Sequence, residues 1–254
     1  CWRVTPVSNL FPARHGSRAH CSEASRGSRS RSGPPESEPL KFVPCRKGVP
    51  GRRWFGNGPI AHGSRAGRQS RHHSEEEGIV ADERVGNATD ETTDIGPLVS
   101  REQLERVLGY LSVGADEGAR AVAGGGRATG AELHRGFFVE PTVLADVDDA
   151  MRVAQEEIFG PVLSVLPFDD IDEVIRRANH TSYGLASAVW TTDLRTAHRV
   201  AHALAAGTVW INAYNVVDPA MPFGGYKMSG WGRELSQHAL DEYTELKSVC
   251  MSLG

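Results

Sequence analysis

Apolar residues recur at helical spacing just after residue 100. Ser100 and Gln103 have the spacing of a capping box, in which each side chain bonds the backbone N–H of the other residue. The apolar positions that follow are one turn apart: Leu104, Val107, Leu108 and Leu111. This pattern predicts an amphipathic helix that begins after Ser100.

Two short extended segments are predicted downstream of that helix. The apolar run Ala119–Ala123 is stopped by three consecutive glycines, which is typical of a strand followed by a turn. Phe137–Leu144 is also apolar and rich in strand-forming residues, but it contains Pro141. Because proline cannot donate to a ladder, we expect an edge strand or an irregular one there.

Strands and helices then alternate regularly up to residue 211. Three apolar runs read as strands: Val162–Phe168, Leu185–Trp190 and Thr208–Ile211. Between the first two, Asp169 or Asp170 is expected to cap a helix that ends at Asn179 and buries Ile171, Val174, Ile175 and Ala178. Strands joined by helices at this spacing predict right-handed crossovers in one parallel sheet, and therefore an α/β fold.

The second connecting helix is expected to start at Asp193 and to stop at Gly207. Its predicted apolar face carries Leu194, Ala197, Ala201 and Leu204. A last helix is predicted over about Arg233–Tyr243, and it leads into an extended piece, Leu246–Met251.

Residues 1–83 differ in kind from the rest of the chain. They hold 12 Arg, 11 Ser, 10 Gly and 8 Pro, so 41 of 83 residues are breakers or solvated side chains without periodicity. Such a segment buries too little apolar area to offset its ordering entropy. We expect it to be largely disordered, apart from a short extended piece near Leu40–Pro44. One hypothesis is a GC-rich gene read in the wrong frame, which the upstream nucleotide sequence would test.

Charge follows the same division. Residues 1–83 carry 14 Lys and Arg against 8 Asp and Glu, a net +6, whereas residues 84–254 carry 14 against 24, a net −10. The basic run Ser28–Ser32 could be an RNA-binding arm, but a merely solvated segment fits charge runs better. We therefore expect no nucleic-acid partner.

Cysteine spacing and hydropathy exclude several protein classes. Cys1, Cys21, Cys45 and Cys250 fit no disulfide framework and no CxxC metal site, and the ten histidines show no metal-ligand spacing. A reducing, cytoplasmic setting is expected. No apolar run reaches the length of about 18 residues that a membrane span needs. A start at Cys1 in place of Met leads us to expect a fragment.

Residues 84–254 contain four motifs whose order and spacing are informative. They are Gln155–Val162 (QEEIFGPV), Asn179–Ala186 (NHTSYGLA), Gly207–Asn212 (GTVWIN) and Met221–Glu234 (MPFGGYKMSGWGRE). Together with Val85-Gly86-Asn87 and Asp94–Leu98, they resemble the aldehyde dehydrogenase superfamily over about 171 of the 254 residues. The resemblance implies an incomplete aldehyde dehydrogenase catalytic domain over residues 84–254, with a terminal oligomerisation strand at about 244–254.

Two residues of the first motif are candidates for cofactor binding. A carboxylate such as Glu157 can accept two hydrogen bonds from a sugar diol. The resemblance implies that Glu157 binds the ribose beside the nicotinamide of NAD or NADP and that Phe159 contacts the cofactor near that ring. On base rates alone, Glu157 would be a surface acid and Phe159 a core residue.

The last motif supplies candidates for substrate binding. Glycines beside Phe223 favour a tight, non-helical path. The resemblance implies that this region walls a substrate tunnel lined by Phe223 and Val217, and an aromatic wall suits the apolar body of an aldehyde. Asn212 could bond loops around the active site, although a structural asparagine is more common. The loop Tyr214–Phe223 is most similar to the betaine-aldehyde, phenylacetaldehyde and retinal branch.

The chemistry that the resemblance implies needs groups that we do not find. A cysteine thiolate attacks the aldehyde, NAD(P)+ accepts a hydride, and a glutamate-activated water releases the acid. Neither Cys21 nor Cys45 follows a Gly-Gln pair, the Glu-Leu-Gly-Gly base motif is absent, and no GxGxxG loop follows a strand. We assign no catalytic residue and expect the chain alone to be inactive.

The expected partners follow from the same resemblance. They are a small-molecule aldehyde in the intact parent enzyme and either a homo-oligomer or a complex with a full-length homologue. The alternative function is a non-catalytic subunit that assembles with that homologue.

Overall fold

A computed structural model describes residues 59–63, 83–130 and 132–254, and for 59–63 the backbone alone. The elements, in chain order, are β1 (Pro59–Gly63), α2 (Arg101–Glu117), β2 (Arg120–Ala123), β3 (Thr142–Ala145), α3 (Arg152–Gln155), β4 (Val162–Phe168), α4 (Ile171–Asn179), β5 (Ala186–Val189), α5 (Leu194–Ala203), β6 (Thr208–Ile211) and α6 (His238–Tyr243). Single turns of 3₁₀-helix occupy Leu133–Arg135 and Lys227–Ser229.

The predicted helix after Ser100 is confirmed as α2. The Ser100 hydroxyl accepts a hydrogen bond from the Gln103 N–H at 3.2 Å, and Gly118 ends the helix with a φ of 104°. The reciprocal half of the capping box was predicted wrongly. The Gln103 side chain bonds two carbonyls about 55 residues away.

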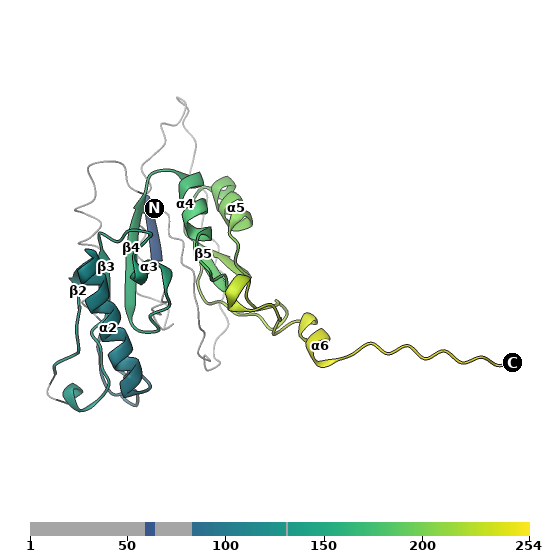
Figure 1. Ribbon diagram of the computed structural model, residues 1–254, viewed down its shortest axis with the longest axis horizontal. Helices are drawn as coiled ribbons and strands as arrows, with labels where there is room; N and C mark the ends of the chain where they lie inside the picture. The colour runs from purple at the N-terminus through teal and green to yellow at the C-terminus, as the bar shows by residue number, and fades with distance from the viewer. Residues whose placement is uncertain (1–58, 64–82, 131) are drawn as a thin grey trace, which may run out of the picture.

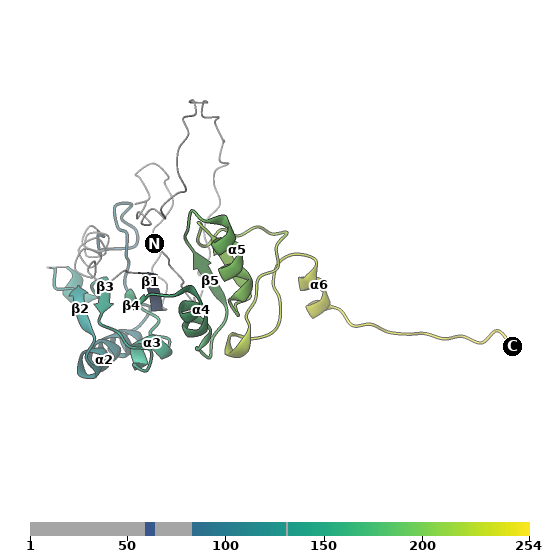
Figure 2. The same ribbon diagram turned by 90° about the horizontal axis from the view of Figure 1, so that it is seen from above.

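Strands β4 and β3 are the two inner strands of a four-stranded sheet with the order β1-β4-β3-β2 (Figures 1 and 2). Strand β4 pairs with β1 on its outer side. It pairs in parallel with both β1 and β3, while β2 is antiparallel to β3 at one edge. The predicted strand β2 is confirmed. The predicted segment Phe137–Leu144 is irregular, with an isolated bridge at Val139 and a strand, β3, that begins only after Pro141. The alternative of an edge strand is wrong, because β3 lies between β4 and β2.

Strands β5 and β6 pair only with each other among the described strands, and they run parallel. The unit β5–α5–β6 is therefore the predicted parallel β-α-β crossover. The expectation that β4 would share a sheet with both strands is wrong, because both edges of β4 are already hydrogen-bonded to β1 and β3. The α/β fold class itself stands.

Strand β1 lies in the segment for which no regular structure was expected. Its residues pair with β4 in register from Pro59 opposite Ser164 to Gly63 opposite Phe168. That expectation therefore fails for these five residues. The piece near Leu40–Pro44 and the residues Cys21 and Cys45 lie outside the described part of the chain.

Three apolar clusters lie in the described part of the chain, and the smallest joins Val143, Leu163 and Val165 of β3 and β4. The two larger ones pack helices against strands. One packs α2 and α3 against β3 and β4, around Val107, Leu144 and Val162. The other lies between α4, α5 and the strands β5 and β6, around Val174 and Val200. Burial of each aliphatic side chain contributes on the order of 1.5–3 kcal/mol relative to leaving it in water.

The buried face of α5 agrees with the predicted one at Ala197 and Leu204, which are buried, and differs at Leu194. Leu194 is 70% exposed, and the buried side chains are Thr196, Ala197 and Val200, followed by Leu204 at the helix end. Asp193 caps the helix as expected, but the helix stops at Ala203, before Gly207. Val200 is β-branched and wholly buried, so its packing sets the face that α5 turns inward.

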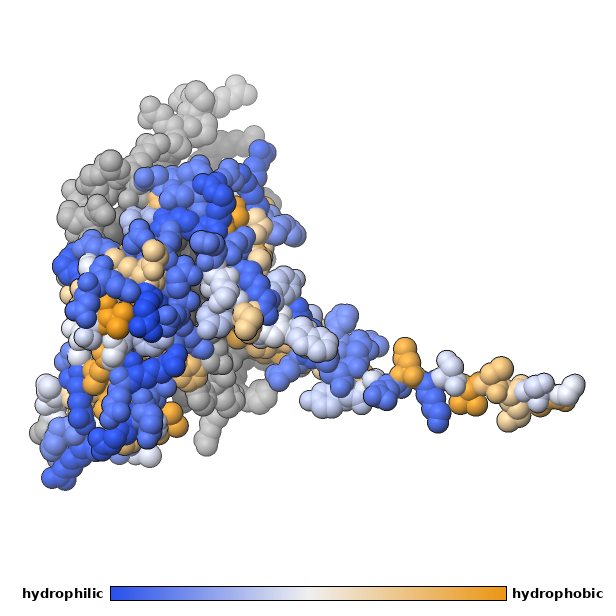
Figure 3. Space-filling view, in the orientation of Figure 1, coloured by the Kyte–Doolittle hydropathy of each residue, from blue (hydrophilic) through white to orange (hydrophobic). Residues whose placement is uncertain are grey.

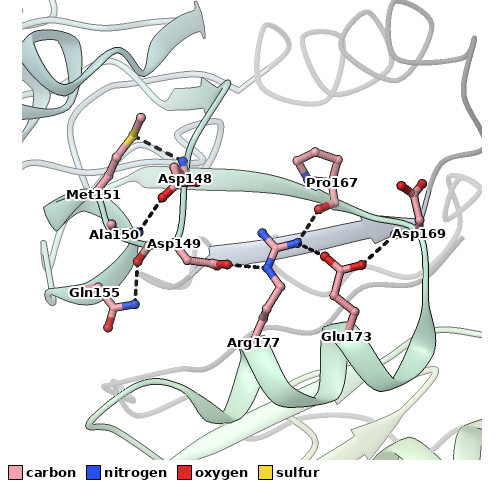
Figure 4. Close-up of polar contacts among 9 residues, drawn as sticks. All are labelled: Asp148, Asp149, Ala150, Met151, Gln155, Pro167, Asp169, Glu173 and Arg177. Atoms are coloured by element: carbon pink, nitrogen blue, oxygen red, sulfur yellow. Dashed lines mark hydrogen bonds and ion pairs between the residues drawn. The ribbon is translucent and has the colours of Figure 1, made fainter.

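Arg177 fastens α4 to its surroundings (Figure 4). Its guanidinium bonds Asp149 at 2.5 Å, Glu173 at 3.0 Å and the Pro167 carbonyl at 2.7 Å. Asp170 caps the same helix by accepting from the N–H groups of Asp172 and Glu173. One arginine thereby links α4 to the end of β4 and to the loop that precedes α3.

The C-terminal region is less regular than predicted. Helix α6 covers only His238–Tyr243, since Glu234 forms an isolated bridge with Phe223 and Leu235 and Ser236 have φ angles of 60° and 54°. Residues 244–254 leave the body as an extended segment whose apolar side chains stand in solvent (Figure 3). In the described part of the chain, no helix is both long and apolar enough to cross a membrane.

Candidate cofactor and substrate site

The turn Glu157–Gly160 connects α3 to β4, and one face of α2 holds it in place. The Gln103 side-chain amide donates to the carbonyls of Ile158 at 3.1 Å and Phe159 at 2.8 Å. Arg106 donates to the Glu157 carbonyl at 2.6 Å. Three consecutive carbonyls of the turn are thus satisfied by two side chains of α2.

Gly160 allows the turn to lie directly on α2. A Cβ atom built on Gly160 would be 2.5 Å from Cγ2 of Val107, which is a clash. Phe159 has a φ of 59°, a left-handed conformation that is costly for a bulky residue. The bonds from Gln103 maintain this conformation by holding the carbonyls on both sides of it.

The two predicted cofactor residues therefore share one rigid turn. Glu157 and Phe159 are both half-buried, and Ile158 between them points into the core at 3% exposure. Both side chains are thus partly accessible, while the residue between them is buried. Such a pair can bind a hydroxylated, planar ligand.

Glu156, the preceding residue, is tied to α2 as well. Tyr110 donates its hydroxyl to Oε2 of Glu156 at 2.7 Å, and Arg152 pairs with Oε1 at 2.8 Å. The Arg152 hydrogen bond, followed by that from Tyr110, lowers the pKa of the Glu156 carboxyl from its usual 4.5 to about 2. Burial, with the Glu156 hydrogen bond, raises the pKa of the Tyr110 phenol above its ordinary value.

The two predicted substrate residues lie in the loops that follow β6. Phe223 is half-buried and exchanges backbone hydrogen bonds of 2.8 and 2.7 Å with Glu234. Val217 is 51% exposed. The structure thus presents both as surface that an apolar ligand could cover, on a segment remote in sequence from Glu157.

Close backbone contacts explain the glycines of the last motif. A Cβ on Gly207 would be 1.7 Å from the Gly224 carbonyl oxygen, and one on Gly224 would be 2.2 Å from that of Gly232. Arg233 closes the loop by donating to the carbonyls of Gly225, Trp231 and Gly232. The segment is therefore packed backbone to backbone.

Lys227 attaches this loop to the turn after α4. Its ammonium donates to the carbonyls of Asn179 at 2.9 Å and Thr181 at 3.1 Å, and burial lowers the pKa of the lysine. Ser229 also accepts from the Gly184 N–H at 3.0 Å. The motifs at 179–186 and 221–234, which are separate in sequence, form one structural unit.

The side chain of Asn212 has a structural role. Both ends of its side-chain amide bond the backbone of Thr191, so it links the ends of β5 and β6. The alternative of a structural asparagine is therefore the better description.

Sequence reasoning missed the residues of α2 that hold the turn. Gln103, Arg106 and Tyr110 lie on the same side of the helix as Val107, at positions i, i+3, i+4 and i+7. Polar groups on an otherwise core-facing stripe were an available signal, because polar atoms there need partners.

Cysteine and metal chemistry can be judged for the described residues. Cys250, the described cysteine, is exposed in the C-terminal segment. No group of three His, Cys, Asp or Glu side chains within 83–130 and 132–254 is placed to hold a metal ion. The assignment of no catalytic residue stays a prediction.

The motifs that share this geometry also match a known sequence pattern. The pattern of the aldehyde dehydrogenase family matches residues 78–249, which is more than half of the chain. The chain belongs to the aldehyde dehydrogenase family. This confirms the resemblance carried by the four motifs.

Curated members of this aldehyde dehydrogenase family are similar in sequence. The aldehyde dehydrogenase DhaS of Bacillus subtilis is 56% identical over 170 residues, which cover 67% of this chain and 34% of that protein. The betaine aldehyde dehydrogenase of Rhizobium etli is 54% identical over 170 residues and is covered to 35%. The chain thus spans about a third of the length of these relatives.

Solved aldehyde dehydrogenases are similar in fold. The NAD+ complex of the Bacillus cereus enzyme has a TM-score of 0.70 and 49% identity, with 76% of this chain and 39% of that chain covered. The Mycobacterium tuberculosis enzyme with NAD+ also has a TM-score of 0.70, at 44% identity, covering 76% of this chain and 40% of that one. The fold is therefore part of an aldehyde dehydrogenase fold.

Proposed function

We propose that this chain supplies the C-terminal part of an NAD(P)+-dependent aldehyde dehydrogenase that oxidises an aldehyde to a carboxylic acid. In this proposal Glu157 and Phe159 bind the cofactor, and Phe223 and Val217 contact the substrate. The observation that carries it is the turn whose carbonyls Gln103 and Arg106 hold, on which Glu157 and Phe159 are both half-buried, within a chain of this family.

The residues present fit one end of a dinucleotide. Glu157 offers carboxylate oxygens, which accept hydrogen bonds from a ribose diol, and Phe159 offers an apolar ring edge for a planar base. When bound, NAD(P)+ accepts a hydride from the substrate. NAD+ is the cofactor named for two of the similar solved enzymes. The choice between NAD and NADP is left to experiment.

The substrate class follows from the loop after β6. Several relatives with 54% identity are betaine aldehyde dehydrogenases. The loop Tyr214–Phe223 resembles the same branch, and Phe223 offers an apolar surface to the body of an aldehyde. We therefore infer an aldehyde of the betaine-aldehyde, phenylacetaldehyde or retinal type.

The reaction also needs a thiolate and a general base, and we assign neither to this chain. Cys250 stands at the far end of an extended segment, and the sequence around Cys21 and Cys45 lacks the Gly-Gln that precedes a family nucleophile. We therefore infer that the chain alone does not turn over aldehydes. Its residues bind and orient the reactants.

One observation favours a second candidate, a non-catalytic subunit. Leu246, Val249, Met251 and Leu253 are 77–107% exposed at the C-terminus. Apolar side chains in that state favour association with a full-length homologue or with a second copy.

A chimera tests the proposed enzyme. Residues 84–254 would replace the matching third of the Rhizobium etli betaine aldehyde dehydrogenase, and NADH formation would be followed with betaine aldehyde. We expect the chimera to be active and the 254-residue chain alone to be inactive. A folded chimera without activity would contradict the proposal, and activity of the chain alone would contradict the missing nucleophile.

Mixing the chain with the intact Rhizobium enzyme tests the second candidate function, a non-catalytic subunit. Co-elution in size-exclusion chromatography, lost on removal of residues 244–254, would favour the subunit. Separate elution would count against it.

A further inference from the structure

Tyr110 lies at the centre of a charged cluster formed with Arg106, Arg152 and Glu156, next to the candidate cofactor turn. Its side chain is buried, with 8% of the residue exposed. The guanidinium carbons of Arg106 and Arg152 lie 5.3 and 5.5 Å from its ring centre. The ring is thus in cation–π contact with two arginines, an arrangement that restricts all three side chains.

Each member of this cluster reaches a different part of the same loop. Arg106 bonds the Glu157 carbonyl at 2.6 Å, and Tyr110 bonds the Glu156 carboxylate at 2.7 Å. Arg152 completes the cluster with bonds of 2.8 and 3.0 Å to the two oxygens of Glu156. Hydrogen bonds to charged groups are shorter and stronger than neutral ones, so the cluster resists displacement of the loop.

The cluster and the turn are consecutive in sequence. Glu156 is the residue before Glu157, and its N–H bonds the Arg152 carbonyl at 2.8 Å at the end of α3. A shift of Glu156 would therefore move the Glu157 backbone away from Arg106 and strain the left-handed Phe159. Tyr110 bonds the residue that directly precedes Glu157 in the chain.

We propose that Tyr110 is a positioning residue, and that its bond to Glu156 is a latch that fixes the turn Glu157–Gly160 in the geometry that binds the cofactor. This inference rests on the proposed function for the identity of the ligand. The latch itself is a property of α2 and the loop, and it can be measured without any ligand.

Hydrogen–deuterium exchange on the full 254-residue chain tests the latch. The variants are Tyr110→Phe, Glu156→Gln and the double variant, with Tyr243→Phe as a control because Tyr243 is 87% exposed. We expect peptides spanning 156–162 to exchange about tenfold faster in Tyr110→Phe, since a hydrogen bond to a charged group is lost. Glu156→Gln should have at least this effect, because the bonds from Tyr110 and Arg152 both lose their charged acceptor. The double variant should behave like Glu156→Gln, because removing the hydroxyl adds little once the charge that it bonds is gone.

Two results would overturn the latch. One is unchanged exchange at 156–162 in Tyr110→Phe. The other is an equal rise in peptides from β5 and β6, which would show that Tyr110 stabilises the whole fold without a local effect on the turn.

Binding of NAD+ to the same proteins, followed by calorimetry, links the latch to the cofactor. We expect Tyr110→Phe to weaken NAD+ binding about tenfold while Tyr243→Phe leaves it unchanged. Faster local exchange with unchanged NAD+ affinity would overturn the positioning role. Absence of NAD+ binding by the unaltered chain would count against cofactor binding by this chain as proposed, and the exchange result would then decide the latch alone.

Discussion

Asn212 and Thr191 form two hydrogen bonds between one side chain and one backbone. Nδ2 of Asn212 donates to the Thr191 carbonyl at 2.9 Å, and Oδ1 accepts from the Thr191 N–H at 2.8 Å. The Asn212 N–H also donates to the Val189 carbonyl at 2.9 Å. The amide therefore continues the ladder of β5 and β6 beyond the last paired residues, Val189 and Ile211.

Replacing Asn212 by alanine should weaken this junction. Both side-chain bonds are lost, and alanine tolerates the φ of 53° less well than asparagine does. We expect the free energy of unfolding to fall by about 1–3 kcal/mol. Asn212→Gly is the matched control in chemical denaturation, because it loses the same bonds without the backbone strain. Equal stability of the alanine variant and the unaltered chain would contradict the inference that the Asn212 side chain stabilises the junction of β5 and β6.

The glycine contacts give a paired prediction of opposite sign. Gly207→Ala should lower the free energy of unfolding by more than about 3 kcal/mol, because its Cβ would overlap the Gly224 carbonyl oxygen. Gly109→Ala in α2 meets nothing within 4 Å and should raise stability by about 0.5–1 kcal/mol through helix propensity. Thermal unfolding of the two variants checks this, and a loss in both would refute the distinction.

Lowering the pH should remove the contribution that the Glu156 carboxylate makes to the free energy of unfolding. Because its pKa in the folded chain is about 2 against an ordinary 4.5, the stabilisation is complete above about pH 4.5 and is lost as the pH falls toward 2. The stability difference between the unaltered chain and Glu156→Gln should shrink over that interval. Denaturant titrations at several pH values measure it, and a difference that persists at pH 2 would show that charge is not the cause.

Cofactor and substrate variants should separate kinetically in the active chimera. Glu157→Gln should raise the KM for NAD+ by roughly tenfold, since the hydrogen bonds to a charged acceptor are weakened, with little change in the KM for the aldehyde. Phe223→Ala should do the reverse, because an aromatic wall is lost at the substrate. Variants that both change the KM for NAD+ alone would remove Phe223 from the substrate site.

Local sequence patterns predicted the elements whose ends are set by local chemistry. Ser100, Asp170 and Asp193 each cap the helix that the sequence predicted, because a side chain two or three residues from free N–H groups needs no distant partner. The strands β4 and β5 were found for a similar reason, since their apolar runs are buried almost throughout, and the apolar run of β6 is half-buried.

Partner choice across the chain was less predictable. Nothing in the spacing of Gln103 indicates that its amide will bond Phe159, 56 residues away. The separation of β4 from β5 depends on which strand occupies each edge of β4, and one of these strands, β1, came from a segment whose composition argued against order. Helix α6 was overestimated because Arg233 and Glu234 bond the Phe223 loop.

The candidate site also combines features that the local sequence predicts with features that depend on distant partners. The sequence motifs named Glu157 and Phe159, and the structure places them on one rigid turn. The residues of α2 that bond this segment, Gln103, Arg106 and Tyr110, were not predicted, because their partners lie 46 to 55 residues further along the chain.

The extended C-terminal segment has an entropic consequence for any association. Residues 244–254 are eleven residues whose side chains lie in solvent. A partner that binds them must immobilise each backbone at a cost of about 1–2 kcal/mol per residue. Burial of apolar surface contributes roughly 25 cal/mol for each Å², so several hundred Å² must be buried to offset this ordering cost before any net affinity results. A complex built on this segment alone would be weak, so a tight one must also cover the body of the protein.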